Sequence, residues 1–452
     1  MSQSAQKLQQ FRSKAYQLLG RAKDATFDLM DAVLVTRNIY SFAELSLSPV
    51  FRRKWPSVYE AIDDCRPHRH KLMKLYLQEI PINQPSQRVI LAGDHTAWPR
   101  TEAPTLKDRT YEHGAKVISG KPITLGHGYS TLVWIPEEKG SPKGYRFAYW
   151  ALPLRHERIT SHETPITKAV FQLKQVCRHL KKRPVSLWDS EYGCANFVNL
   201  TADLNADKLM RLRPNRCVFG EPPTYQGKGR PKKHGQKMKL SDPTTWGISV
   251  ESMEINDPTW GQIEIQRWSQ FHFYHSSDHP MEIILIQRKG QGLSQKAAKP
   301  MWLAWIGSEK LSLIELWEFY LRRFAIEHWN RFVKQRLHWT KAKLGTTEKG
   351  QRWSDLMPIL TWQLWLAREI IEDNPLPWQK PLPTEKLTPG RVAQSFPGLL
   401  AAIGTPAKSS KPRGKSPGWE TGKKRNKKPR YPVVKKTVTR KKKGKKEQKE
   451  AA

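Results

Sequence analysis

The sequence predicts an α/β protein: a mixed sheet with a β-strand insertion, preceded by an α-helical N-terminal region and followed by a disordered basic tail. Three observations support this fold class. Residues 1–85 show apolar positions at helical spacing. Between residues 86 and 213, short β-branched runs alternate with helical segments, which is typical of a mixed α/β layer. Residues 401–452 hold 19 Lys and Arg against 3 Asp and Glu, with too few apolar residues to bury a core.

The strand and helix candidates of residues 86–213 follow one another in a regular order. Strands are predicted wherever short apolar runs end at a turn or at an acid, and helices wherever apolar residues recur every three to four positions. We expect strands at 88–93, 131–136, 145–154, 184–187 and 208–212, and helices at 166–180 and 196–204.

Residues 214–305 have a different texture, with a Gly, Pro and Lys-rich stretch followed by three alternating segments, 247–255, 261–274 and 281–287. Alternation favours half-buried strands, so we expect a small antiparallel β subdomain inserted here. Residues 306–375 then return to helix, with one long helix at 311–337 and another at 355–371. Residues 376–452 are Pro- and Lys-rich, and we expect them to be mostly disordered.

The charge of the chain favours a polyanionic partner. Its 78 Lys and Arg against 41 Asp and Glu make a formal charge of +37, of which the last 52 residues hold +16 and the first 400 hold +21. Nucleic acid is the leading candidate, because Lys and Arg neutralise phosphates at long range. A membrane surface is disfavoured, since the basic runs adjoin no apolar helix face. Without an apolar leader or an apolar run of about 18 residues, the chain is expected to be soluble and intracellular.

Three acids could support chemistry. Asp94 and Asp189 each follow a hydrophobic strand candidate, where polar groups of α/β sheets often form an active cleft, although such an Asp is also a common turn former. The third, Glu327, lies in YLRRFAIEHWNRFVK. At 100° per residue, Tyr320, Arg323 and Lys334 all fall within about 40° of Glu327 on a helix. A salt-bridged exposed face would show the same spacing.

These residues carry a resemblance. The chain resembles the DDE transposases of bacterial insertion sequences, in the group whose third acid lies in a Y-(2)-R-(3)-E-(6)-K motif, which Tyr320, Arg323, Glu327 and Lys334 match without a gap. The block after Asp94 (HTAW) and the block around Asp189 (WDSEYG) also resemble that group. The resemblance spans about residues 85–370.

The resemblance implies an RNase H-like catalytic domain, in two parts at residues 86–213 and 306–375, interrupted by the insertion at 214–305. Residues 1–85 would then bind DNA ends. Asp94, Asp189 and Glu327 would be the catalytic acids and would hold Mg²⁺ or Mn²⁺, as two ions that activate one oxygen and stabilise another in phosphoryl transfer. Tyr320, Arg323 and Lys334 would bind DNA phosphates.

The implied partners are double-stranded DNA, as transposon ends and as target, and a second copy of the chain in a synaptic homodimer. No membrane partner is expected, and the implied location is cytoplasmic and nucleoid-associated. A further DNA contact is predicted at Arg230, since GKGRPKKHG resembles a minor-groove AT-hook, although a basic surface loop would look alike. Two alternative functions remain open: a non-catalytic DNA-binding protein derived from a transposase, and a metal-dependent DNA nuclease of host defence.

Overall fold

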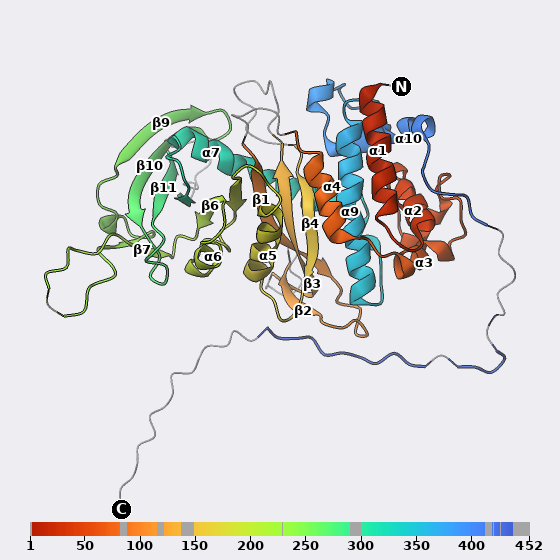
Figure 1. The fold of residues 1–452 in the computed structure, drawn as a ribbon, viewed down its shortest axis with the longest axis horizontal. Helices are drawn as coiled ribbons and strands as arrows, with labels where there is room; N and C mark the ends of the chain where they lie inside the picture. The colour runs from red at the N-terminus through yellow and green to blue at the C-terminus, as the bar shows by residue number, and fades with distance from the viewer. Residues whose placement is uncertain are drawn as a thin grey trace, which may run out of the picture.

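A curved mixed sheet of ten strands runs through the molecule, with a layer of helices against one end of it (Figure 1). The computed structural model describes residues 2–81, 88–114, 122–136, 149–227, 229–289, 300–411, 418, 420–424 and 426–436. The predicted strand at 145–154 lies partly outside the described residues, and its described part forms a strand from Leu152.

The first part of the sheet consists of six strands and two crossover helices. They are β1 (Ile90–Pro99), β2 (Thr110–His113), β3 (Ile123–Ile135), β4 (Leu152–Ile159), α5 (Pro165–Cys177), β5 (Val185–Trp188), α6 (Ala195–Leu200) and β6 (Asp207–Leu212). Strand β3 pairs antiparallel with β1 and β4, whereas β5 and β6 run parallel to β1. Helix α6 connects the parallel pair β5 and β6, as parallel strands require. Three antiparallel strands followed by two parallel ones is an RNase H-like order, so the predicted fold class is confirmed.

The insertion continues this sheet and is not a separate β subdomain, which corrects the expectation from the sequence. Its strands are β7 (Cys217–Phe219), β8 (Lys237–Lys239), β9 (Glu251–Asp257), β10 (Gly261–Phe271), β11 (Met281–Arg288) and β12 (Met301–Ile306). Strand β12 pairs antiparallel with β6 and so joins β11, β10 and β9 to the central sheet, while β7 and β8 pair with each other. The sequence MWLAWI of β12 is buried over five of its six residues, so it lacks the alternation by which a strand is recognised.

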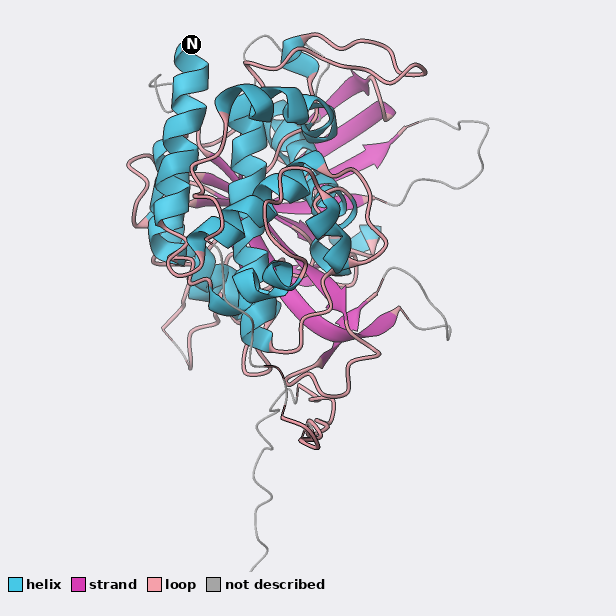
Figure 2. Cartoon of the chain, turned by 90° about the vertical axis from the view of Figure 1, so that its right-hand side faces the viewer, coloured by secondary structure: helices cyan, strands magenta, loops and turns pink. Residues whose placement is uncertain are grey.

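The helical layer is centred on α9 (Thr347–Ala367), which packs against β4 on one side and α1 and α10 on the other. Figure 2 shows these helices in front of the strands. The layer consists of α1 (Gln3–Gln17), α2 (Lys23–Val35), α3 (Pro56–Asp64), α4 (Arg69–Gln78), α9 and α10 (Pro389–Ile403), with 3-10 turns at Phe42–Leu47, Trp339–Lys341 and Thr384–Lys386. A further 3-10 turn lies in the insertion at Pro243–Thr245. Within the described part of the chain, none of the helices has the length and apolar character needed to cross a membrane.

The region 376–452 contains one helix, α10, that the sequence analysis did not expect. Helix α10 buries Val392, Ala393, Phe396 and Leu400 against α2 and α9. This helical spacing of apolar residues lies just before the Lys-rich stretch, whose average composition conceals it. Residues 437–452 lie outside the described residues.

The segment after α10 is held by arginines of the N-terminal helical region. Three backbone carbonyls accept hydrogen bonds from guanidinium groups that also pair with the buried Asp28 or Asp31. The bonds run from Arg12 to Gly404 (3.3 Å), from Arg52 to Ala407 (2.8 Å) and from Arg53 to Lys408 (2.8 Å).

These contacts predict where the chain can be shortened. A chain ending at Ile403 should lose about 2–4 kcal/mol of unfolding free energy, because hydrogen bonds to charged groups contribute about 1.5–3 kcal/mol each in buried positions and these are partly exposed. A chain ending at Lys411 keeps all three bonds and serves as the control. Urea unfolding of both chains measures the difference, and equal stability would show that the segment contributes nothing to the fold.

Candidate active site

Asp94 and Asp189 lie side by side because β1 and β5 pair in parallel register. The pairing runs from Ile90 opposite Val185 to Gly93 opposite Trp188, and each Asp is the next residue of its chain. Strand β1 does not end at Asp94, as the sequence suggested, but continues to Pro99 against β3. Strand β5 ends at Trp188, just before Asp189. From Asp94 onward, β1 is therefore paired with β3 and no longer with β5.

Gly93 makes the packing beside the two acids feasible. A Cβ added to Gly93 would stand only 2.0 Å from the Trp188 ring, so a larger residue here would displace that ring. The Trp188 ring is fully buried and packs against Tyr192 and Phe197, with ring centroids 4.9 and 4.8 Å away. Gly93 therefore leaves room for the aromatic cluster that packs beneath the two acids.

Glu327 lies on α8 (Phe324–Gln335), which follows α7 (Leu313–Arg322) after a break at Arg323. The expected single helix over 311–337 is therefore wrong. At the break the backbone forms tighter bonds, from Arg323 N–H to the Tyr320 carbonyl (3.1 Å) and from Ile326 N–H to the Arg323 carbonyl (3.2 Å). These bonds to the third residue back are typical of 3-10 geometry and mark a local change of helix course.

Two side chains of α8 hold it against β1. Asn330 Nδ2 donates to Asp94 Oδ2 at 3.1 Å, and Lys334 Nζ donates to Thr96 Oγ1 at 2.5 Å. Glu327 and Asn330 are three residues apart and so share a helix face. The face of α8 that bears Glu327 is therefore the face bound to Asp94.

The Arg323 guanidinium supplies positive charge among the three acids. It is buried and forms an ion pair with Glu327, whose side chain is 47% exposed. Burial disfavours the Arg323 cation, but Tyr320 and the three acids outweigh this effect, so the pKa of Arg323 is raised. In this structure one guanidinium thus compensates carboxylates contributed by three different elements.

The pKa of Asp94 is raised. Burial raises its pKa from 3.8 to about 6, Arg323 opposes the rise, and Asp189 adds to it. A carboxyl group that is partly desolvated beside a like charge binds its proton more tightly. Such perturbed acids are concentrated at functional sites.

The amino-acid pattern of known families agrees with this geometry. A family model described as DDE superfamily endonuclease matches residues 15–270, which is more than half of the chain. The chain belongs to the DDE superfamily endonucleases. The matched region contains Asp94 and Asp189 and ends before α8, so the position of Glu327 in this DDE endonuclease rests on the motif and the structure.

The chain is also similar to a solved structure, the cryo-EM piggyBac transposase synaptic complex with hairpin DNA. The two share 11% sequence identity with a TM-score of 0.38, over 89% of this chain and 80% of the other. No curated protein matches this chain.

The structure brings together five of the seven predicted residues, and a sixth, Tyr320, contacts one of those five. Asp94, Asp189, Arg323, Glu327 and Lys334 meet between β1, β5 and α8. Tyr320 is fully buried, with the Arg323 guanidinium 5.7 Å from its ring centroid, so it contacts Arg323 and presents no surface to a ligand. Arg230 is not brought to the acids: it is exposed, in the loop between β7 and β8.

Asn330 is the residue that the sequence analysis missed. It is buried, and its Oδ1 has no hydrogen-bond partner among the described residues, while its Nδ2 binds Asp94. Its position three residues after Glu327 was the available signal, since this spacing places both residues on one helix face.

The donor set of this DDE endonuclease fits a divalent metal chemically. Asp94, Asp189 and Glu327 offer only oxygen, which hard cations prefer, and the unpartnered Asn330 Oδ1 is a further oxygen acceptor. Among the described residues, no three acids, histidines or cysteines yet stand close enough to hold an ion. To bind a metal ion, the Glu327 carboxylate would have to give up its ion pair with Arg323.

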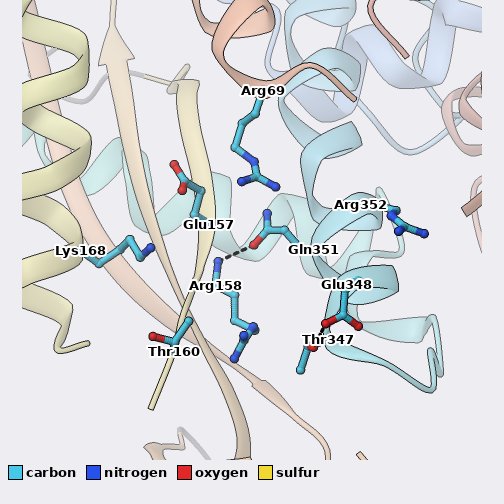
Figure 3. Close-up of a pocket in the computed structure, with 9 residues that line it drawn as sticks. All are labelled: Arg69, Glu157, Arg158, Thr160, Lys168, Thr347, Glu348, Gln351 and Arg352. Carbon is cyan, nitrogen blue, oxygen red and sulfur yellow. Dashed lines mark hydrogen bonds between the residues drawn. The ribbon is translucent and has the colours of Figure 1, made fainter. Parts of the chain in front are cut away.

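A second polar hollow of about 360 Å³ lies where α4, β4, α5 and α9 meet, and Figure 3 shows the nine residues that line it. Three of its four cations pair with carboxylates, whereas Arg352 donates to the backbone carbonyls of Ile62 and Asp63. Arg69 forms a bidentate pair with Asp355 (2.7 and 2.9 Å), and Lys168 pairs with Glu163 at 2.7 Å. Arg158 likewise pairs with Asp108 outside the hollow. Charge balance makes this hollow a junction between the sheet and the helical layer, and none of the three acids lines it.

The raised pKa of Asp94 predicts how the stability of the metal-free protein changes when Asp94 is replaced by Asn. The native state binds this proton more tightly than the unfolded chain, so the stability associated with Asp94 is full below pH 4 and is lost as pH rises through about 6. Asp94→Asn should therefore raise the unfolding free energy at pH 7.5 by up to about 3 kcal/mol, with the gain vanishing near pH 4. Urea unfolding with a chelator present measures this, and a gain independent of pH would contradict the burial argument.

Proposed function

We propose that this DDE endonuclease is a DNA transposase of the bacterial insertion-sequence type with a Y-(2)-R-(3)-E-(6)-K motif. It would bind the ends of its element, cleave them and join the freed 3′-hydroxyl to target DNA. The observation that supports this most is the convergence of Asp94 and Asp189, on adjacent parallel strands, with the α8 face that bears Glu327. Its charge of +37 suits a DNA substrate, because phosphate neutralisation drives such binding.

Asp94, Asp189 and Glu327 would together hold Mg²⁺ or Mn²⁺, as two ions. When bound, these ions supply activation of the attacking oxygen and stabilisation of the leaving oxygen of a phosphodiester. The requirement on the protein is that its carboxylates be ionised, and at neutral pH an Asp94 with a pKa of about 6 meets it.

The remaining residues of the site would position groups around the phosphorus. Asn330 orients the Asp94 carboxylate through its 3.1 Å hydrogen bond. Arg323, once released from Glu327, is placed to bind a non-bridging phosphate oxygen, and its planar guanidinium can do so bidentately. The Tyr320 ring packs against the Arg323 guanidinium. Lys334 adds positive charge next to Asp94.

Two copies of the chain would act together in a synaptic complex with two DNA ends. A non-catalytic DNA-binding protein would need no convergence of acids around a cation, and a host-defence nuclease would cleave without joining. Strand joining in the presence of Mg²⁺ therefore separates the proposed function from both alternatives.

Removing any one acid tests the assignment of the site. Asp94→Ala, Asp189→Ala and Glu327→Ala should each abolish cleavage of element-end DNA while end binding remains within about threefold, because a lost metal ligand leaves the basic surface intact. Asp203→Ala is the control, since Asp203 is an exposed acid paired with Lys174 outside the site. Cleavage retained in the Glu327 variant would contradict its placement.

Arg323→Lys tests whether this guanidinium acts on the phosphate. A lysine keeps the charge but cannot form two parallel bonds, so single-turnover cleavage should fall at least about tenfold, equivalent to about 1.4 kcal/mol of transition-state stabilisation. End binding should change much less. Arg178→Lys, at an exposed position just after α5, is the control. Equal losses of cleavage and binding would assign Arg323 to structure alone.

A further inference from the structure

Part of the basic tail runs alongside the edge strand β2 and forms a single β-bridge with it. Tyr431 N–H donates to the Pro104 carbonyl and Val434 N–H to the Arg109 carbonyl, both at 2.8 Å. Thr110, the first residue of β2, forms a parallel bridge with Val434. A segment some 30 residues beyond α10 thus returns to the central sheet, and Figure 1 shows it passing beneath β2 and β3.

The docked segment has an inner and an outer side. Tyr431, Val433 and Val434 are half-buried, whereas the described residues from 426 to 430 are exposed. The Lys107 ammonium lies 5.1 Å from the Tyr431 ring centroid, and Arg109 Nη2 donates to the Tyr431 carbonyl at 3.4 Å. Tyr431 and the two valines therefore pack toward the protein, whereas Lys427, Lys428, Arg430 and Lys435 are exposed and Lys436 is half-buried.

The docking site is an edge of the sheet. Strand β2 pairs with β3 on one side, and the free side of an edge strand offers unpaired N–H and C=O groups to another strand. The tail segment covers this edge. Edge protection alone, however, requires no cations, and here the tail brings several to a surface that already holds the exposed Lys107.

Gathering like charges in this way is unfavourable unless a polyanion is present. Lys428 Nζ lies 3.6 Å from where a Cβ on Gly345 would stand, just before α9, and Arg100 donates to the Leu344 carbonyl at 2.7 Å. The docked cations thus continue a basic surface formed by the end of β1 and the loop before α9. A row of phosphates would neutralise both parts of this surface at once.

The basic surface lies at the end of β1, the strand that also bears Asp94. Strand β1 runs from Asp94 to Pro99 along β3, and Pro99 and Thr110 are both opposite Gly126. The tail segment bridges to β2 at this same end of the sheet. DNA that enters the acid site would therefore meet the docked segment on one flank.

We propose that residues 426–436 are a docked DNA-phosphate-binding segment, which holds Lys428, Arg430, Lys435 and Lys436 at fixed positions beside the acid site. This inference rests on the proposed function, since it takes duplex DNA as the ligand. It adds a docked part to a region that the sequence analysis expected to be mostly disordered.

The docking can be tested in the full-length protein without DNA. Val434→Pro removes the N–H that bonds Arg109 and leaves every charge in place. Val433→Pro is the matched control, because within the described chain the Val433 N–H donates no backbone hydrogen bond. Trypsin should cut between Arg430 and Tyr431 at least about fivefold faster in Val434→Pro than in the wild type or in Val433→Pro. Equal rates in all three would overturn the docking.

The DNA contact is tested with two variants that remove the same charge from the same tail. One replaces four of the five cations of the docked segment by Gln: Lys428, Arg430, Lys435 and Lys436. The other replaces four distal cations by Gln: Arg440, Lys441, Lys442 and Lys443. Each fixed phosphate contact contributes about 0.9 to the slope of log affinity against log salt concentration, so the docked set should flatten this slope by about 2–4 and weaken binding of duplex DNA at least fivefold more than the distal set.

Val434→Pro, whose charge is unchanged, should weaken DNA binding at least about threefold relative to Val433→Pro. Equal losses from the docked and distal sets, with no effect of Val434→Pro, would overturn the inference while leaving the proposed function intact. A wild-type chain that binds no duplex DNA at low salt would instead refute the proposed function itself. The two failures are therefore distinguishable.

Discussion

The parallel pairing of β1 with β5 is the constraint on which the rest of the site depends. The register places Gly93 opposite Trp188, so the next residues of the two strands, Asp94 and Asp189, are neighbours, and Gly93 leaves room for the buried Trp188 ring. The strands bring two negative charges together in a partly buried place, which raises the pKa of Asp94. The negative charge of these two carboxylates needs to be balanced by cations from other parts of the chain or from solution.

The chain provides one such cation from the break between two helices. Arg323 lies where α7 ends and α8 begins, and its buried guanidinium pairs with Glu327 while it also attracts both aspartates. The first 400 residues hold a net charge of +21, and the docked tail segment adds further Lys and Arg at the β2 edge of the same sheet. This distribution of charge suits the proposed action on a polyanion.

The local features of this arrangement could be predicted from the sequence. The helical face shared by Arg323, Glu327 and Lys334 follows from spacing alone, and the two aspartates were marked by the apolar runs before them. Features that depend on pairing could not be predicted: β1 continues past Asp94 because β3 accompanies it, and β12 joins the insertion to the sheet although its sequence does not alternate. The hydrogen bond from Asn330 to Asp94 links residues 236 positions apart, and the docking of Val434 on β2 depends on an edge that only the folded sheet presents.

The central claim is that Asp94, Asp189 and Glu327 share one cation site. Iron(II) substituted for magnesium, with ascorbate and peroxide, generates hydroxyl radicals that cut the backbone next to the bound ion. The account predicts cuts in three segments, within β1 near Asp94, just after β5 near Asp189, and in α8 near Glu327, all of which disappear together when any one of the three acids is replaced by Ala. Cuts confined to a single segment, or cuts at two segments that survive the loss of Glu327, would contradict it.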